Sequence, residues 1–268
     1  MDRAMSVRTE IRDDGLAHVS LCRGAAGNAI DLETARALLD AARECERQDV
    51  RAVMLTGEGR SFCVGGDLRE FSTLSGEALQ QHLLAVTDAL HEALRTFAAI
   101  DAPMVAAVQG AVAGAGIGLA AAADVTLAAD DASFTAAYTG IGYSPDAGVS
   151  WFLPRLVGPK RALDLLLTNR RVPAAEAAAI GLVSRVVAAG RLAEEAARTA
   201  EALRRGPTAA FGATRRLVAS GLTVDLGPHL DQEARALAAA AVSDTGREGV
   251  AAFLAKRRPE FLPLPPSP

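Results

Sequence analysis

The chain has 268 residues, half of them hydrophobic and 22% charged, a composition typical of a globular protein with a sizeable core. Its formal charge of -4 gives no electrostatic reason to expect nucleic acid or an anionic membrane as a partner. Three cysteines without CxxC or His/Cys metal spacing indicate neither a disulfide framework nor a metal site, so we expect a cytoplasmic protein.

Apolar periodicity predicts the elements of the first half of the chain: a hairpin of strands at 7–11 and 17–21, a helix after residue 31, a strand at 51–56, a helix at 77–97, and strands at 104–108 and 125–129. Asp31 is suited to cap the first helix, because its carboxylate can accept hydrogen bonds from free backbone amides. The apolar stretch 102–123 consists largely of alanine and glycine and is interrupted by Gln109, so we expect buried core and not a membrane span.

The second half of the chain is predicted to be mostly helical. Pro159 stands in the first turn of a helix, and Gly181 is placed to end another before a strand at 182–187. Beyond this strand the pattern is helical, with breaks at 206–207 and 227–228, and the chain ends in a proline-rich tail. Strands separated by loops and helices indicate an α/β fold.

Two glycine-rich loops, at 61–68 and 110–118, each follow a β-branched run and lead into a helical pattern. Glycine lets the backbone approach a ligand closely, and the first amides of a helix have no intrahelical acceptor. Two such loops could bind one oxyanion from both sides. The second loop also contains GxGxxA, the weak form of a dinucleotide fingerprint, but the next strand follows too soon for a βαβ crossover.

Four segments in order along the chain, 62–68, 107–116, 145–148 and 248–257, resemble the enoyl-CoA hydratase/isomerase (crotonase) superfamily. The resemblance implies an α/β fold: a spiral of ββα repeats over 1–195, and a helical trimerisation region over 196–268. It also implies homotrimers or homohexamers that bind acyl-CoA thioesters. The substrate would carry coenzyme A itself, so no separate cofactor is expected.

The resemblance places the thioester carbonyl between the backbone amides of Val64 and Ala115. Such preorganised donors stabilise the negative charge that develops on the oxygen of an enolate or tetrahedral intermediate. Further positions match coenzyme A contacts of the family: Gly65, Gly66, Asp67 and Leu68 for the adenine, and Phe253 and Lys256 from a C-terminal helix, sometimes that of a neighbouring subunit.

Hydratases of this family use two glutamates, and the matching positions here are Gly118 and Tyr138. Without these carboxylates, water cannot be activated and a proton delivered in the usual paired way, so simple hydration is not expected. Asp146, in a Pro-Asp step that resembles the isomerase branch, is the remaining candidate base. One base suffices for double-bond isomerisation, because it can remove a proton from one carbon and return it to another while the oxyanion hole holds the dienolate.

Asp146 together with His91 also resembles the aryl-CoA dehalogenase branch, in which an aspartate attacks the ring and a histidine activates water. Tyr138 replaces the tryptophan of that branch, and its hydroxyl can donate a hydrogen bond to a substrate. Hydratase or dehalogenase-like activity through Asp146 and His91 therefore stays open, as does a non-catalytic CoA-binding homologue. The structural alternatives are a turn cap for Asp146, a partly exposed helix residue for His91 and a solvated charge for Lys256.

Aromatic residues are expected around the acyl group. We expect Tyr143, Trp151 and Phe152 to bury the carboxyl group of Asp146 and so make it a stronger base. Leu68 and Phe71, with the tyrosines, indicate a bulky or aromatic acyl chain. Cys63, within the first glycine loop, is expected to be a small buried packing residue.

Overall fold

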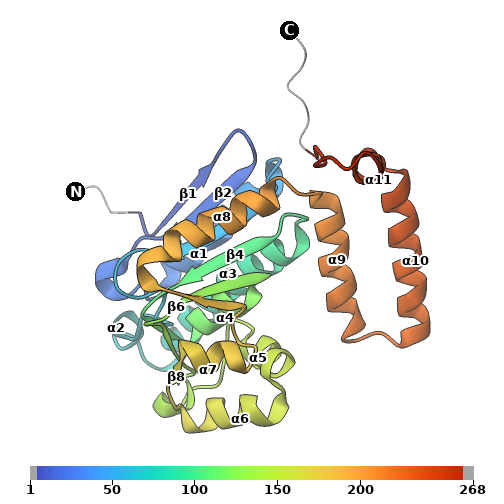
Figure 1. The fold of residues 1–268 in the computed structure, drawn as a ribbon. Coiled ribbons are helices and arrows are strands. Elements are labelled where there is room, and N and C mark those ends of the chain that lie inside the picture. The colour runs from blue at the N-terminus through green and yellow to red at the C-terminus, as the bar shows by residue number, and fades with distance from the viewer. Residues whose placement is uncertain (1–4, 262–268) are drawn as a thin grey trace.

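A computed structural model describes residues 5–261 and contains two β-sheets and a separate group of C-terminal helices (Figure 1). The larger sheet has the order β1-β2-β3-β4-β6-β9 and is parallel except for the β1-β2 hairpin. Its strands are β1 (Val7–Ile11), β2 (Leu16–Leu21), β3 (Ala52–Gly57), β4 (Met104–Val108), β6 (Val125–Ala129) and β9 (Arg185–Val187). The smaller sheet, in the order β5-β7-β8, consists of β5 (Ala111–Ala113), β7 (Ser133–Thr135) and β8 (Val172–Pro173).

Helices cover both faces of the larger sheet, as expected for parallel strands. One face packs against α1 and α3 in the main core, which contains Val19, Val53 and Ala106. The alternate residues of the same strands, such as Ala52 and Val105, pack against α8 (Figure 1). The helices are α1 (Leu32–Arg47), α2 (Leu68–Phe71), α3 (Gly76–Ala99), α4 (Ala115–Ala122), α5 (Val149–Val157), α6 (Pro159–Thr168), α7 (Ala174–Ala179) and α8 (Leu192–Arg204).

The predicted elements of the first half are confirmed within a residue or two at each end. Asp31 caps α1 as expected, since its carboxylate accepts a hydrogen bond from the Thr34 amide at 2.7 Å. The stretch 102–123 forms β4, β5 and α4 and is mostly buried. Among the described residues, no helix combines the length and the apolar character needed to cross a membrane.

Two predicted boundaries in the second half are wrong. The strand expected at 182–187 begins only at Arg185, because the Leu182 amide bonds to the carbonyl oxygen of Ala177 and closes the end of α7. The break expected at 227–228 lies inside the first turn of α10 (Leu226–Val242), where a proline removes no intrahelical hydrogen bond. The predicted proline-rich tail lies outside the described residues.

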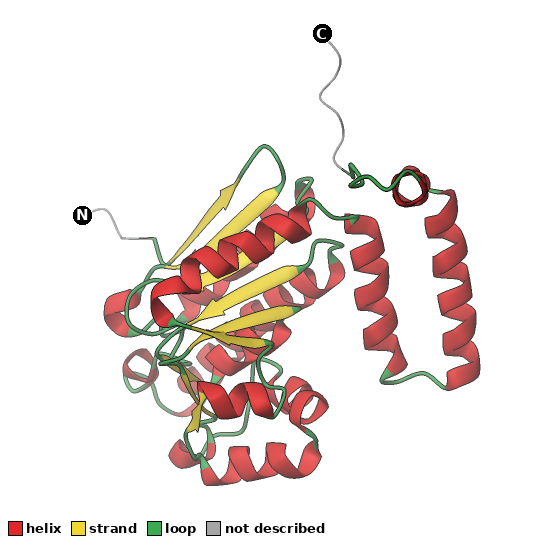
Figure 2. Cartoon of the chain, viewed as in Figure 1, coloured by secondary structure: helices red, strands yellow, loops and turns green. Residues whose placement is uncertain are grey.

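The C-terminal helices α9 (Thr208–Gly221), α10 and α11 (Asp244–Leu254) extend away from the sheets (Figure 2). The helix α8 spans the domain boundary expected at 195 and 196, and its Ala196 and Ala200 pack on the larger sheet. The chain leaves this packed core after Arg204, whose side chain is 4% exposed. The division into two domains itself stays a prediction.

One arginine fixes the first of these helices to the core. Arg215 on α9 bonds to the Asp124 carboxylate at 2.8 Å and to the carbonyl oxygens of Phe97, Ile100 and Ala102. We expect Arg215→Ala to lower the free energy of unfolding by about 2 kcal/mol, because it leaves these acceptors without a donor. Its neighbour Arg216 is 56% exposed and pairs with an exposed aspartate, so Arg216→Ala is the matched control and should cost at most about 1 kcal/mol in urea unfolding. Equal losses in the two variants would contradict this interpretation.

The ion pair between Arg204 and Glu201 makes the stability of the core depend on pH. Arg204 donates two hydrogen bonds to Glu201, of 2.6 and 2.8 Å, and they lower the pKa of Glu201 to about 2. A lowered folded-state pKa contributes stability above the ordinary value of 4.5, and this contribution is lost as the pH falls toward 2. We therefore expect Glu201→Gln to reduce stability at neutral pH and to differ little from the parent near pH 2, measured by urea unfolding. The exposed Glu46→Gln is the control, and it should not alter the pH dependence.

Candidate active site

A cavity of about 580 Å³ lies between α2, α3, the N-terminus of α4 and the turn that carries Asp146. Apolar side chains of α3, such as Leu83 and Leu90, form one wall, and backbone of both glycine loops forms another. Among the described residues that line it, Asp146 is the only one with an ionisable side chain apart from Tyr138 and Tyr143. The cavity therefore brings together most of the residues that the sequence singled out.

The two glycine loops are joined by backbone hydrogen bonds. Cys63 forms a parallel bridge with Val112, and its carbonyl oxygen accepts from the Ala113 amide at 2.9 Å. Cys63 is fully buried, and burial raises the pKa of its thiol to about 12, as expected of a packing residue. This pairing holds the backbone that follows Cys63 beside the N-terminus of α4.

The Val64 amide is occupied, contrary to the expectation from the sequence. It donates to the carbonyl oxygen of Gly27 at 3.1 Å and cannot also bind a ligand in this arrangement. Gly65 then turns the chain with φ +95°, and Ile30 bonds to the carbonyl of Gly65 and to the amide of Asp67. The amide of Gly66, between them, points away from Ile30 and has no acceptor among the described residues.

Ala115 lies in the wall of the cavity, and the role of its amide as an oxyanion donor stays a prediction. Ala115 is the first residue of α4, follows Gly114 with φ +50°, and lines the cavity. Its N–H has no acceptor in the described part of the chain, as usual for the first turn of a helix. Gly66 and Ala115 thus present two free amides in the wall of one cavity.

The carboxylate of Asp146 is bound by Tyr138. The Tyr138 hydroxyl donates to Asp146 Oδ1 at 2.6 Å, and the ring is 8% exposed. Burial and the neighbouring negative charge raise the pKa of Tyr138, so the hydroxyl keeps its proton at neutral pH. Tyr138 is a hydrogen-bond donor to Asp146, whereas the sequence suggested donation to a substrate.

His91 approaches the same turn from α3. Its Nε2 lies 3.1 Å from the backbone nitrogen of Ala147. An amide can only donate, so Nε2 accepts this bond and carries no proton. His91 is not among the residues that line the cavity, and its role as a base in the reaction stays a prediction.

Gly118, at one of the positions where the family's hydratases have a glutamate, has no room for a side chain. A Cβ atom there would lie 2.2 Å from the carbonyl oxygen of Ala147 and 2.8 Å from its Cβ. The turn with Asp146 therefore packs directly on the backbone of α4.

The aromatic environment of Asp146 differs from the expectation. Tyr143 lines the cavity, as do Leu68 and Phe71. Trp151 and Phe152, however, pack edge to face against each other on α5 and do not line it. Both belong to α5, which begins at Val149, after the turn that carries Asp146.

The residues expected to bind adenine have different environments. Gly65, Gly66 and Leu68 line the cavity, with Leu68 at 48% exposure. Asp67 instead caps α2 and pairs with Arg23 at 2.8 Å. Burial opposes its ionisation, but the Arg23 hydrogen bond and two backbone amides outweigh it and lower the pKa of Asp67.

Phe253 and Lys256 were expected to contact coenzyme A. Helix α11 lies far from α2 and α4, which border the cavity of the same chain (Figure 1). Phe253, near the end of α11, is 82% exposed, and Lys256 follows in a left-handed conformation with φ +53°. Neither lines the cavity of its own chain, so their contact with coenzyme A stays a prediction.

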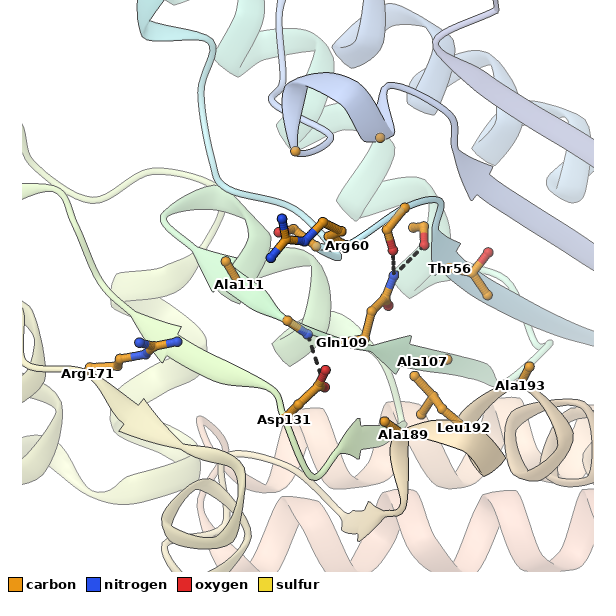
Figure 3. A pocket seen from close by; sticks show the side chains of 16 residues that line it. Thr56, Arg60, Ala107, Gln109, Ala111, Asp131, Arg171, Ala189, Leu192 and Ala193 are labelled. Carbon is orange, nitrogen blue, oxygen red and sulfur yellow. Dashed lines mark hydrogen bonds between the residues drawn. The ribbon is translucent and has the colours of Figure 1, made fainter.

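A second, more open hollow of about 810 Å³ adjoins the first glycine loop (Figure 3). Gln109 donates to the carbonyl oxygens of Gly57 and Gly59 and holds this loop in place. Arg60, Arg171 and the carboxylate of Asp131 line the hollow, and neither arginine forms an ion pair with a described residue. The sequence analysis missed these two cations, since isolated surface arginines form no motif.

Comparisons with known proteins show the family to which this chain is similar. The family model described as enoyl-CoA hydratase/isomerase matches residues 12–263. A protein of Rhodobacter capsulatus named "Probable enoyl-CoA hydratase" is 41% identical and covers 96% of this chain and 97% of its own. The 1,2-epoxyphenylacetyl-CoA isomerase of Escherichia coli is 34% identical over 93% of this chain and 95% of its own.

Solved structures of related proteins have the same fold as this chain. A Streptomyces coelicolor structure, described as a putative enoyl-CoA hydratase, superposes with a TM-score of 0.89 at 35% identity and covers 97% of this chain and 95% of its own. The chain belongs to the enoyl-CoA hydratase/isomerase family, and its fold is the α/β crotonase fold. The resemblance read from the four sequence motifs is confirmed.

Proposed function

We propose that the protein is an acyl-CoA enzyme that moves a carbon-carbon double bond, with Asp146 as its single acid/base. The observation that carries this proposal is the presence of one carboxylate in a cavity that also presents two free amides, those of Gly66 and Ala115. Family membership supports a thioester as the substrate.

The reaction needs no second acid or base. Asp146 removes a proton from C2 of a 3-enoyl thioester, and the electron pair moves onto the thioester oxygen as a dienolate. The amides of Gly66 and Ala115 stabilise this charge, at roughly 2.7 to 4 kcal/mol per donor. Protonated Asp146 then returns the proton to C4, which gives the conjugated 2-enoyl thioester and restores the carboxylate.

Hydration is less well supported, although the Rhodobacter relative carries that name. Adding water requires one group to activate water and one to deliver a proton. Among the described residues that line the cavity, Asp146 has the only carboxylate, and Gly118 has no room for a second one. A dehalogenase-like reaction would need His91 free to activate water, whereas its Nε2 is bound to the backbone.

The coenzyme A end of the substrate has candidate contacts beside the cavity. The two hollows adjoin where Val64 packs on Gly27. Arg60 and Arg171 bring positive charge without an internal partner to the second hollow, and phosphate groups are natural ligands for such arginines. We place the nucleotide end along the backbone of residues 65–68 toward this charge.

We also propose a homotrimer or homohexamer. Large apolar side chains are exposed along the C-terminal helices: Val218, Leu222, Leu226, Leu230, Leu237, Val242, Val250, Phe253 and Leu254. Apolar surface of this extent usually marks an interface. In such an assembly Phe253 and Lys256 of one copy would approach the coenzyme A of another. Light scattering tests this, and a stable monomer at micromolar concentration would exclude it.

The reaction is tested by supplying three thioesters: a 3-enoyl-CoA, a 2-enoyl-CoA and a 4-halobenzoyl-CoA. We expect an isobaric, conjugated product from the first, and no water adduct or halide release from the others, by liquid chromatography with mass spectrometry. Rapid water addition to the 2-enoyl-CoA would replace the proposal by hydratase activity. Halide release would replace it by a dehalogenase.

A further inference from the structure

We propose that Tyr138 and His91 are positioning residues that together hold Asp146 in its working orientation, and that neither transfers a proton in the reaction. This inference rests on the proposed function of Asp146, and it names two residues that act through it. Three observations carry it: the conformation of the turn, the two hydrogen bonds made to it, and the way α4 packs beneath it.

The turn that carries Asp146 contains two residues in left-handed conformations, and the Val149 amide bonds to the Asp146 carbonyl oxygen at 2.9 Å. Ala147, fully buried, has φ +49°, and Gly148 has φ +71°. Left-handed conformations are unfavourable for alanine, because its Cβ approaches the following carbonyl. Such a residue persists only where its surroundings determine it, and strained residues of this kind gather at functional sites.

Two side chains from outside the turn bond to it. His91, 56 residues away, accepts the Ala147 amide hydrogen at 3.1 Å. Tyr138 donates to Asp146 Oδ1 at 2.6 Å, and no other described residue bonds to this carboxylate. The first bond fixes the backbone, and the second fixes the side chain. Oδ2 has no hydrogen-bond partner among the described residues.

The third side of the turn is the backbone of α4. Gly118 has no side chain, and the Ala147 carbonyl oxygen lies only 2.2 Å from where a Cβ atom would stand. The turn is therefore held at its amide by His91, at its carboxylate by Tyr138 and at its carbonyl side by α4. In the proposed reaction, Asp146 alone exchanges a proton with the substrate.

The ionisable groups that face Asp146 are few. Tyr138 carries its proton, since burial raises its pKa, and the buried thiol of Cys63 has its pKa raised to about 12. His91 faces the next residue through an unprotonated Nε2. Among the described residues, Tyr138 is thus the one group that donates a hydrogen bond to the Asp146 carboxylate.

Four variants test the proposal. Tyr138→Phe removes the hydroxyl bond, and Tyr143→Phe removes a hydroxyl that lines the same cavity but bonds to no described residue. His91→Gln keeps an acceptor that can reach the Ala147 amide, and His91→Leu removes it. We measure kcat, the KM for the best thioester, and deuterium uptake by the peptide that contains residues 145–152, without substrate.

We expect Tyr138→Phe and His91→Leu to lower kcat by roughly 10- to 100-fold with KM little changed, the size of effect that a small misplacement of a catalytic group produces. Tyr143→Phe removes no bond to Asp146 and should lower kcat less than Tyr138→Phe does. His91→Leu should speed deuterium uptake in the turn, and His91→Gln should restore both uptake and much of kcat.

The proposal is overturned if His91→Gln is as inactive as His91→Leu while deuterium uptake is normal, because His91 would then transfer a proton itself. It is also overturned if Tyr138→Phe leaves kcat unchanged. If the parent protein catalyses another thioester reaction, the proposed function fails, yet the deuterium uptake of the turn still decides whether His91 holds it.

Discussion

Replacing Asp146 by asparagine should lower kcat by roughly 10³-fold, within the range that general acid/base catalysis contributes. Asparagine has nearly the same shape and can still accept the Tyr138 hydrogen bond at Oδ1, so the turn keeps its conformation. The amides of Gly66 and Ala115 are untouched, and affinity for an acyl-CoA thioester should be unchanged by isothermal titration calorimetry.

The control for this variant is Asp88→Asn, an exposed aspartate on α3 outside the cavity, which should turn over as fast as the parent. The two alternatives to catalysis by Asp146 give different results. A protein that only binds coenzyme A esters shows no turnover in either variant or in the parent. Full activity in Asp146→Asn would mean that another group removes the proton.

Introducing a glutamate at Gly118, the position of a missing hydratase carboxylate, should not create a hydratase. Its Cβ would lie 2.2 Å from the Ala147 carbonyl oxygen, which is backbone and cannot move without the turn. We expect Gly118→Glu to lower the free energy of unfolding by about 3 kcal/mol, the upper part of the range for overpacking, and to abolish isomerisation by displacing Asp146.

Alanine variants separate the clash from the added charge. Gly118→Ala alone should cost about 1 to 3 kcal/mol, although alanine is otherwise the better helix former. Gly190 has no atom within 4 Å of its Cβ position and no left-handed φ, so Gly190→Ala is the control and should not destabilise. Urea unfolding measures these differences. A stable, active Gly118→Ala variant would show that the turn is free to shift.

Sequence reasoning identified the fold because four separate segments agreed in order, and identified the cavity because glycine loops have a recognisable composition. It chose the amide of Val64, whereas the free amide in the cavity wall is that of Gly66, two residues later. The Val64 amide bonds to Gly27, and the left-handed turn at Gly65 is what exposes Gly66. Apolar periodicity does not show the direction in which a single backbone amide points.

The contacts of Asp146 were beyond prediction for a different reason. The sequence placed Tyr138 and His91 near the site, but the bond from His91 joins residues 56 positions apart and involves a main-chain amide. No spacing rule reports which side of a histidine ring meets the backbone. The missing carboxylate at Gly118 was visible from the sequence, whereas the reason, a turn resting on α4, required coordinates.

Asp146 and the two free amides lie in different connections between the strands of the larger sheet. Strands β6 and β9 are neighbours in the sheet, yet residues 130–184 lie between them and include the whole turn of Asp146. The two free amides belong to other crossovers of the spiral, after β3 and β4. In the proposed reaction the acid/base and the two amides therefore come from different crossovers, which meet where β7 pairs with β5 and where the Asp146 turn packs on α4.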